Sequence, residues 1–355
     1  MHSFAAQILT NYKTIIMQNE QQLPPPPAQM LQMITGFWTS CCIYAAARLS
    51  IADALADGAK SAATLAQLTK TNEKALYRLL RALCSVGVFT ETAKGFELTP
   101  LGNTLRSNVP GSMRAMAIAQ LGDHFNAWGD LLYSVKTGNI AFDNIHGMSI
   151  WKYYETHPED GANFTKAMAG LTMGAVMNIL PVYSFNAFKN IVDIGGGNGT
   201  LLTSILKNAP GAKGIVLDEA YLEEQAKSNI AQSGMSDRCT FQKGSFFETI
   251  PEGADAYVLK MILHDWNDAD SVKILSNINK AMKKGSKLII IEAVISEGNT
   301  PHPAKFLDIN MLAMTGGRER TEKEWKELIG TASLKFNKVV LSHSPMFSLI
   351  EVEKA

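Results

Sequence analysis

From residue 189 onward, short apolar runs alternate with helical segments, and this regular pattern limits the 355-residue chain to a few folds. The strand-like runs are 190–194, 213–217, 239–242, 256–259 and 287–291, and helical patterns near 200–207, 220–232 and 270–282 separate most of them. We expect Asp268 or Asp270 to cap the last of these helices. Strands joined by crossover helices form a parallel sheet with helices on both faces. Two further runs, 338–341 and 347–352, are joined too closely for a crossover helix, so we expect an antiparallel hairpin that closes the sheet.

The first part of the chain has a different, helical pattern. The prolines at 24–27 predict an extended segment that separates an N-terminal arm from the body. Apolar residues then recur at three- and four-residue steps, which predicts one face of a long amphipathic helix. The residues on that face are Met30, Ile34, Phe37, Trp38, Cys41 and Tyr44. This face needs a partner.

A winged-helix pattern follows over residues 61–99. Ser61 and Asn72 can each cap a helix, and alternating residues at 88–91 and 96–98 predict a two-stranded wing. Such an element either binds DNA, here through Lys74, Arg78 and Arg81, or serves in packing and dimerisation. Lysine plus arginine equals aspartate plus glutamate at 33 each. Because phosphate contacts dominate DNA affinity, this neutral balance favours dimerisation over a nucleic-acid partner.

Residues 112–185 are mostly helical by period and rich in methionine, which either fills a core or lines a ligand pocket. We therefore expect three parts: a dimerisation domain at 1–110, a helical connection at 111–185 and an α/β domain at 186–355. The four cysteines lack metal-ligand spacing, and the chain has no secretory signal and no apolar stretch of about 20 residues. These features predict a cytoplasmic protein without a metal or a membrane partner.

The chemically active residues follow the ends of the predicted strands, where open α/β sheets bind ligands. The first strand ends at Asp193 and leads into Gly195 and Gly197 of a GxGxG turn, where the backbone can approach a ligand closely. Thr200 stands where a dinucleotide motif has its last glycine, so the turn fits a nucleoside with an amino-acid tail better than a pyrophosphate. Asp218, nineteen residues beyond Gly199, either accepts hydrogen bonds from ribose hydroxyls or is merely solvated.

The later strand ends carry a possible adenine site and a possible base. Ser245 offers a hydroxyl to a purine edge, and Phe246 or its neighbour could cover the purine face, although one of the two rings should belong to the core. His264, just past the fourth strand, is either a structural residue or a general base near neutral pH. Glu292 ends the fifth strand, and we expect it to pair with His264 unless it simply faces water.

In this order, IVDIGGGNGT, GSFF, LKMILHDWND, LIIIEAV and GGRERT resemble small-molecule O-methyltransferases of the plant caffeate and hydroxyindole type, a family with bacterial members. The stretches IYAAARLSIADAL, ALYRLLRALCSVGVF and LTPLG resemble the dimerisation domain of the same family, so the likeness covers residues 35–352. The resemblance implies a Rossmann-like methyltransferase domain behind a helical, winged-helix dimerisation domain.

The resemblance also implies a cofactor, S-adenosylmethionine, and roles for named residues. The residues around the cofactor are Asp193, Gly195, Gly197, Asp218, Ser245, Phe246 and Lys260. His264 would deprotonate the acceptor hydroxyl, flanked by Glu292 and Glu319, and the acceptor pocket would include Phe164, Met168 and Met311. The chain departs from the family at Ser245, where Asp is usual, at Phe246, where Met is common, and at 219–220, where Leu-Pro is common.

The sequence therefore predicts a homodimeric O-methyltransferase that moves a methyl group from S-adenosylmethionine to a hydroxyl of a small aromatic molecule. Most of the catalysis should come from positioning the two reactants. Two alternatives stay open. A relative could keep the cofactor and catalyse decarboxylation or hydroxylation, and a winged-helix regulator could sense S-adenosylmethionine and bind DNA in a salt-dependent manner.

Overall fold

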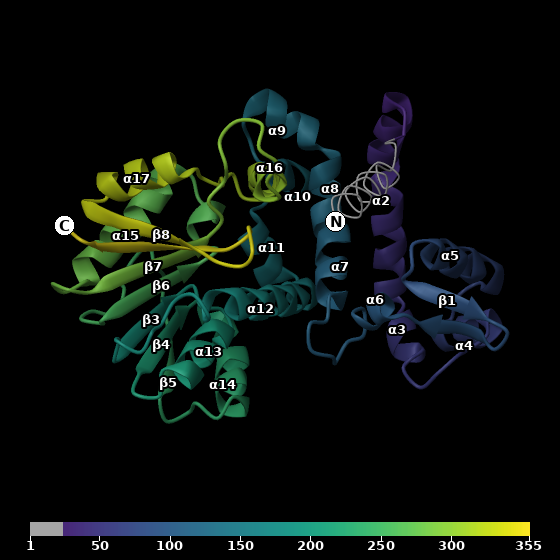
Figure 1. Cartoon of the computed structure of the whole chain (residues 1–355), viewed down its shortest axis with the longest axis horizontal. Coiled ribbons are helices and arrows are strands. Elements are labelled where there is room, and N and C mark those ends of the chain that lie inside the picture. Colours follow the sequence, from purple (N-terminus) through teal and green to yellow (C-terminus); the bar gives the residue numbers. More distant parts are fainter. Residues whose placement is uncertain (1–23) are drawn as a thin grey trace, which may run out of the picture.

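A computed structural model of the chain describes residues 24–355, so the predicted N-terminal arm lies outside the described residues. The chain forms a winged-helix part and a sheet covered by helices, with a group of helices between them (Figure 1). The long helix α2 and its neighbour α7 stand side by side at the boundary between the winged part and that helical group.

The N-terminal part begins with helix α2 (Pro26–Arg48). An extended conformation for 26–27 was predicted and is wrong, because proline fits the first turn of a helix, where its missing N–H has no partner to lose. The remaining elements are α3 (Ile51–Ala54), α4 (Ala62–Thr69), α5 (Glu73–Ser85), β1 (Phe89–Thr92), β2 (Gly95–Leu98) and α6 (Pro100–Asn103). Ser61 and Asn72 cap α4 and α5 as predicted, and β1 pairs with β2 in antiparallel fashion.

One face of α2 carries exposed apolar side chains. Ile34, Phe37 and Trp38 are 62 %, 49 % and 62 % exposed, while the other side of the helix packs against α7 and α5. Within the described part of the chain, no helix is both long and apolar enough to cross a membrane. The apolar face of α2 is thus uncovered by the described part of the chain, and the expectation that it needs a partner stays a prediction.

The middle of the chain is helical, as predicted. Its elements are α7 (Arg114–Leu121), α8 (Asp123–Gly129), α9 (Leu131–Thr137), α10 (Ala141–His146), α11 (Ile150–Thr156) and α12 (Pro158–Ile179). Phe142 and Tyr154 are buried here together with Met314 of α16 (Ala304–Met314), a later helix that packs on α8 and α10. The helical group therefore joins a segment of the α/β part in one core.

The α/β part is a seven-stranded sheet in the order β5-β4-β3-β6-β7-β9-β8. Its strands are β3 (Asn190–Ile194), β4 (Lys213–Asp218), β5 (Cys239–Lys243), β6 (Ala256–Lys260), β7 (Lys287–Glu292), β8 (Leu334–Leu341) and β9 (Ser348–Lys354). The first five are parallel, and β9 pairs in antiparallel fashion with both β7 and β8. The predicted fold class and the closing hairpin are confirmed.

Helices cover both faces of the sheet. One face carries α13 (Thr200–Asn208) and α14 (Glu223–Gln232), and the other carries α15 (Asp268–Ala281) and α17 (Glu322–Thr331). Two short 3₁₀ segments, η1 (Ala220–Leu222) and η2 (Leu263–Asp265), follow β4 and β6. Along β7, Leu288 and Ile290 pack toward α15 and α17, and Ile289 and Ile291 pack toward α13. This alternation explains why a strand buried on both faces is apolar throughout.

The start of α15 differs from the prediction that Asp268 or Asp270 caps it. Asn267 is the N-cap, and its side-chain oxygen accepts a hydrogen bond from the main-chain N–H of Asp270 at 2.9 Å. The helix begins at Asp268, so both aspartates lie in its first turn, where a carboxylate is favourable near the N–H groups.

Candidate active site

The predicted site residues gather at the carboxyl edge of the sheet. Each follows or ends a different parallel strand: Gly195 after β3, Asp218 at the end of β4, Ser245 after β5, Lys260 at the end of β6 and Glu292 at the end of β7. The strand order continues from β3 toward β4 on one side and toward β6 on the other. This reversal is where an open α/β sheet binds its ligand.

The main chain of the glycine turn after β3 contacts the carboxylate of Asp218. Gly195, Gly197 and Gly199 have φ angles of 66°, 58° and 77°, which favour glycine. The main-chain N–H of Gly197 donates a hydrogen bond to Asp218 Oδ2 at 2.6 Å, and that of Glu219 donates to Asp218 Oδ1 at 2.7 Å. Each carboxylate oxygen keeps a free lone pair, so both can still accept a ligand hydroxyl. Burial raises the pKa of Asp218 to about 6.

A second buried carboxylate lies beneath this turn. Asp193 is 1 % exposed, and its Oδ2 has no hydrogen-bond partner among the described residues. Burial raises the pKa of Asp193 to about 7, although the Lys260 ammonium opposes the shift. Burial lowers the pKa of Lys260, although Asp193 opposes that shift in turn. Two carboxyl groups, those of Asp193 and Asp218, therefore lie at this turn, and the Lys260 ammonium acts on the first of them.

The segment after β5 brings an aromatic ring to the glycine turn. A Cβ atom placed on Gly195 would lie 3.7 Å from the ring of Phe246, so this ring borders the turn. Phe247 packs edge-on against Trp266, with ring centroids 4.7 Å apart, and contributes to the core. Both Phe246 and Phe247 pack against the core, so the expectation that only one of the two rings belongs to it is too narrow. The Ser245 hydroxyl accepts a weak hydrogen bond from the N–H of Phe247 at 3.4 Å.

His264 lies on the short 3₁₀ turn that follows β6. The chain leaves β6 through Met261, whose φ of 53° is unusual for a residue other than glycine. His264 is 4 % exposed, and its Nδ1 lies 2.7 Å from Glu319 Oε1. Its Nε2 lies 3.7 Å from Asp265 Oδ1. Burial acts to lower the pKa of His264, but the carboxylates of Asp265 and Glu319 outweigh it and raise the pKa to about 10.

Glu292 does not form the predicted hydrogen bond with the imidazole among the described contacts. Its Oε1 accepts instead from the main-chain N–H groups of Ile262 and Leu263, at 3.1 and 2.7 Å. The reason is that the turn after β6 folds its N–H groups over the end of β7 before it reaches His264. Burial raises the pKa of Glu292.

Glu292 still belongs to one buried cluster with His264 and Glu319, whose ligand-type atoms lie within 4.8 Å of one another. Such spacing would also suit a metal ion. Each of the three side chains, however, already uses one of those atoms in a hydrogen bond. The Oε2 atoms of both glutamates have no hydrogen-bond partner among the described residues.

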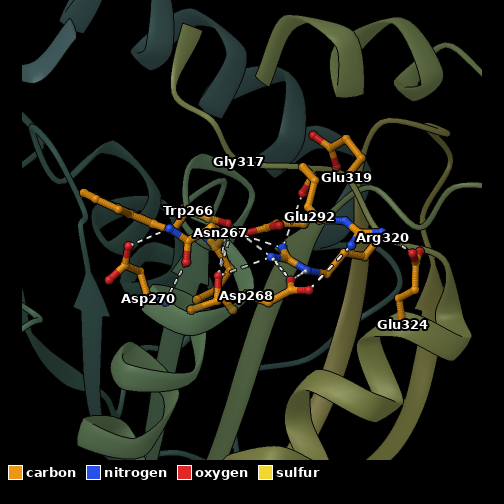
Figure 2. Close-up of polar contacts among 12 residues, drawn as sticks. Trp266, Asn267, Asp268, Asp270, Glu292, Gly317, Glu319, Arg320 and Glu324 are labelled. Atoms are coloured by element: carbon orange, nitrogen blue, oxygen red, sulfur yellow. Dashed lines mark hydrogen bonds and ion pairs between the residues drawn. The ribbon is translucent and has the colours of Figure 1, made fainter. Parts of the chain in front are cut away.

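Three nearby residues were not singled out from the sequence. Asp265 is half-buried beside His264, and desolvation raises its pKa to about 7 against the opposing effect of the imidazolium. Asp308 Oδ1 accepts from the N–H of Glu319 at 2.8 Å and holds that loop. Arg320, 1 % exposed, bonds the turn that carries His264 (Figure 2). Asp265 and Arg320 stand inside HDW and GGRERT, which was the available signal.

The residues expected around the acceptor lie on two helices that flank this turn. Phe164 and Met168 are one turn apart on α12, and Met311 lies in the last turn of α16, eight residues before Glu319. Phe164 stacks on Tyr154 with centroids 4.6 Å apart and meets Trp151 edge-on at 6.4 Å. Trp151 in turn stacks on Trp266 at 6.4 Å. A series of rings thus runs from α12 to the residue two positions after His264.

Comparison with known proteins agrees with this arrangement. A family model described as an O-methyltransferase domain matches residues 128–335, more than half of the chain. The chain belongs to the O-methyltransferase family. A second model, the O-methyltransferase dimerisation domain, matches residues 31–108 and covers the winged-helix part.

Relatives of this O-methyltransferase match over nearly their full length. Phenazine O-methyltransferase PhzM of Lysobacter antibioticus is 40 % identical over 92 % of this chain and 96 % of its own. The crystal structure of LaPhzM superimposes with a TM-score of 0.91, covering 94 % of this chain and all of that one. NcsB1, solved with S-adenosyl-L-homocysteine and 1,4-dihydroxy-2-naphthoic acid, is 31 % identical with a TM-score of 0.78, covering 89 % of this chain and 96 % of that one.

Proposed function

We propose that this O-methyltransferase transfers the methyl group of S-adenosylmethionine to a hydroxyl of a flat, fused-ring aromatic acceptor, with His264 as the general base. The observation that carries the proposal is the buried His264 turn at the carboxyl edge of the sheet. Glu319 engages Nδ1 at 2.7 Å, which leaves Nε2 without a hydrogen-bond partner among the described residues.

The residues at the glycine turn fit the proposed cofactor. Asp218 keeps one lone pair on each oxygen for the two ribose hydroxyls, and a Cβ on Gly197 would meet nothing within 4 Å, so the turn is open there. Asp193 adds a buried carboxylate with an unpartnered oxygen. S-adenosylmethionine carries a sulfonium and an ammonium charge, and it supplies an electrophilic methyl group when bound. Phe246, Ser245 and Lys260 would complete this site from β5 and β6.

The His264 turn fits the work of a base. In the neutral imidazole, a hydrogen bond from Nδ1–H to Glu319 fixes the tautomer and leaves the Nε2 lone pair available. Without a bound cofactor, the pKa of about 10 means that His264 holds a proton on both ring nitrogens at neutral pH, so its action as a base requires this pKa to fall when the cofactor binds. Because positive charges in one buried site repel, a cation in the cofactor site lowers that pKa and favours the neutral, proton-accepting imidazole.

The acceptor class is inferred from the relatives and from the ring series. The relatives include enzymes named for phenazines and for a hydroxynaphthoate. The rings of Phe164, Trp151 and Trp266 lie in sequence toward His264, and aromatic rings favour stacked or edge-on contact with a flat ligand. Met168 and Met311 would fill the remaining space, since methionine adapts to irregular shapes.

We also propose that the enzyme works as a homodimer and divides its tasks along the chain. Residues 1–110 would dimerise through the exposed face of α2, 111–185 would supply the acceptor wall, and 186–355 would bind the cofactor and carry the base. The match of 31–108 to a dimerisation domain and the exposure of Ile34, Phe37 and Trp38 support this division.

The test combines an acceptor screen with one substitution. Methyl-labelled S-adenosylmethionine is incubated with 1-hydroxyphenazine, 1,4-dihydroxy-2-naphthoate and 3-amino-4-hydroxybenzoate, and products are located by mass spectrometry and NMR. We expect a methyl ether, and we expect His264→Ala to lower turnover by about 10²–10⁴-fold while calorimetry shows nearly unchanged cofactor binding. A methyl group found on nitrogen, or full turnover by His264→Ala on an acceptor that is neutral at the assay pH, would contradict the proposal.

A further inference from the structure

A buried arginine bonds both ends of the turn that carries His264. Arg320 is 1 % exposed, and its guanidinium donates from Nη1 to the carbonyl oxygen of Leu263 at 3.1 Å and from Nη2 to that of Trp266 at 3.2 Å. These two carbonyls flank His264 and Asp265 on either side. A guanidinium has a rigid, planar fork of donors, so the two bonds fix the ends of the turn relative to each other.

Arg320 is itself fixed from three directions. Asp268 Oδ1 accepts from both Nε and Nη2, at 3.1 and 2.8 Å, and the guanidinium lies over the ring of Trp325 at 5.3 Å. The Ser271 hydroxyl accepts from Nη2 at 3.3 Å. Figure 2 shows the guanidinium between the Trp266–Asp268 segment and the side of the sheet that carries Glu292. A charged group so fully enclosed and bonded has little freedom to move.

The loop that carries Arg320 also holds the imidazole directly. Glu319 engages Nδ1, and the main-chain N–H of residue 318 donates to the carbonyl oxygen of His264 at 2.9 Å. At Gly317 the two backbones are so close that a Cβ would lie 1.9 Å from that same oxygen. Any movement of the loop relative to the turn therefore changes the position of Nε2.

We propose that Arg320 is a positioning residue for the general base: by bonding the carbonyls of Leu263 and Trp266, it sets where Nε2 of His264 meets the acceptor hydroxyl. The inference rests on the proposed role of His264. It assigns Arg320 no contact with either substrate. Because a misplacement of about 1 Å can cost about 10²-fold in rate, loss of this fork should affect proton removal more than ligand binding.

Arg320→Lys is the test, since lysine keeps the charge but cannot donate to two carbonyls in a fixed plane. The matched control is Arg238→Lys. Arg238 also donates to several main-chain carbonyls, those of Leu206, Ala209 and Ala212 among them, but it precedes β5 at the opposite edge of the sheet. Both arginines hold main-chain carbonyls, but Arg320 is buried and paired with Asp268 whereas Arg238 is partly exposed. The dependence of the loss on acceptor acidity therefore separates an effect on the base from a general structural effect.

Turnover is measured with 1-hydroxyphenazine and with a nitro-substituted hydroxyphenazine whose hydroxyl is already ionised at the assay pH. We expect Arg320→Lys to lose about 10- to 100-fold in kcat on the first acceptor and much less on the second, with cofactor affinity within about twofold of the parent. Arg238→Lys should lose little on either. Equal losses of Arg320→Lys on both acceptors, or none, would overturn the positioning role.

Two further measurements keep the outcome clear. The Nδ1–H resonance of His264, observed by NMR with ¹⁵N-labelled histidine, should shift in Arg320→Lys and stay in place in Arg238→Lys; an unchanged resonance would overturn the proposal. If Arg320→Lys does not fold, Asp268→Asn, which weakens the anchor of the guanidinium at a largely exposed site, should give a smaller loss with the same acceptor dependence. If the loss in His264→Ala does not depend on acceptor acidity, the proposed role of His264 as the base is wrong. If the loss depends on acceptor acidity in His264→Ala but not in Arg320→Lys, only the positioning role of Arg320 is wrong.

Discussion

Replacing Glu319 or Glu292 with glutamine distinguishes two carboxylates that the sequence alone treats alike. Both are buried beside His264, but only Glu319 bonds the imidazole, at 2.7 Å, while Glu292 Oε1 accepts from two main-chain N–H groups. Glutamine keeps a carbonyl oxygen that can still accept those two bonds. It cannot supply the charge that stabilises an imidazolium, so Glu319→Gln should be the more damaging change.

The size of the effect follows from the contact. A hydrogen bond to a charged group contributes about 1.5–3 kcal/mol, and about 1.36 kcal/mol corresponds to a change of one in pKa. Glu319→Gln should therefore lower the pKa of His264 by about one to two. If the charge develops fully on the imidazole during proton transfer, the same free energy lowers the rate of the neutral-imidazole form by about tenfold to a hundredfold. Because a lower pKa also enlarges the neutral fraction at a given pH, the loss is read where the pH profile of each variant reaches its plateau.

The assay compares the pH profiles of kcat for Glu319→Gln and Glu292→Gln on 1-hydroxyphenazine, read at the plateau of each profile, with cofactor affinity measured by calorimetry. We expect the Glu292 variant to keep at least several times more activity than the Glu319 variant, and both to bind S-adenosylmethionine with similar affinity. A Glu292→Gln loss equal to or larger than that of Glu319→Gln would refute this reasoning, because it would show that the charge of Glu292 acts on the reaction.

Three further predictions concern the cofactor site and the dimer. Asp218→Ala should weaken S-adenosylmethionine binding by about 1.5–3 kcal/mol in calorimetry without unfolding the chain, and unchanged affinity would contradict the ribose assignment. Burial raises the pKa of Asp218 to about 6, so the folded chain keeps a proton that the unfolded chain loses near pH 4. The free energy of unfolding should therefore fall as the pH rises from about 4 to 6, and it should fall less in Asp218→Asn. Urea titrations at both pH values can check this. Phe37→Asp on the exposed face of α2 should give monomers in light scattering at micromolar concentration, whereas a dimer that persists would place the interface elsewhere.

Much of the fold could be predicted from residue patterns because the relevant physics is local. The apolar runs of β3 to β7, the caps at Ser61 and Asn72 and the closing hairpin all appear where the sequence placed them. The errors were local too. The predicted extended segment at 26–27 and the caps at Asp268 or Asp270 failed because proline and aspartate suit both the position before a helix and its first turn, so the residue type alone does not fix the boundary.

The site was predictable only in part, and the reason lies in how its residues reach it. Gly195, Asp218 and Glu292 stand at strand ends, and parallel strands bring all their carboxyl ends to one edge, so their proximity follows from the strand pattern. Glu319 comes from a loop after α16, and no periodicity places it beside His264. Its position was available only through the likeness of GGRERT to a known family.

The contacts that hold the base could not be found from residue types, because one partner in most of them is the main chain. We expected a side-chain contact between Glu292 and the imidazole, yet Glu292 accepts hydrogen bonds from the main-chain N–H groups of Ile262 and Leu263. Arg320 holds the carbonyls on the far side of the same turn. A carboxylate thus accepts hydrogen bonds from the N–H groups at one end of the turn, and a guanidinium donates to the carbonyls around His264. In both cases the charge of the side chain strengthens the hydrogen bonds. A base held through its backbone on both sides tolerates changes in its neighbours' side chains poorly, which is why conservative changes such as Arg320→Lys and Glu319→Gln are the informative ones.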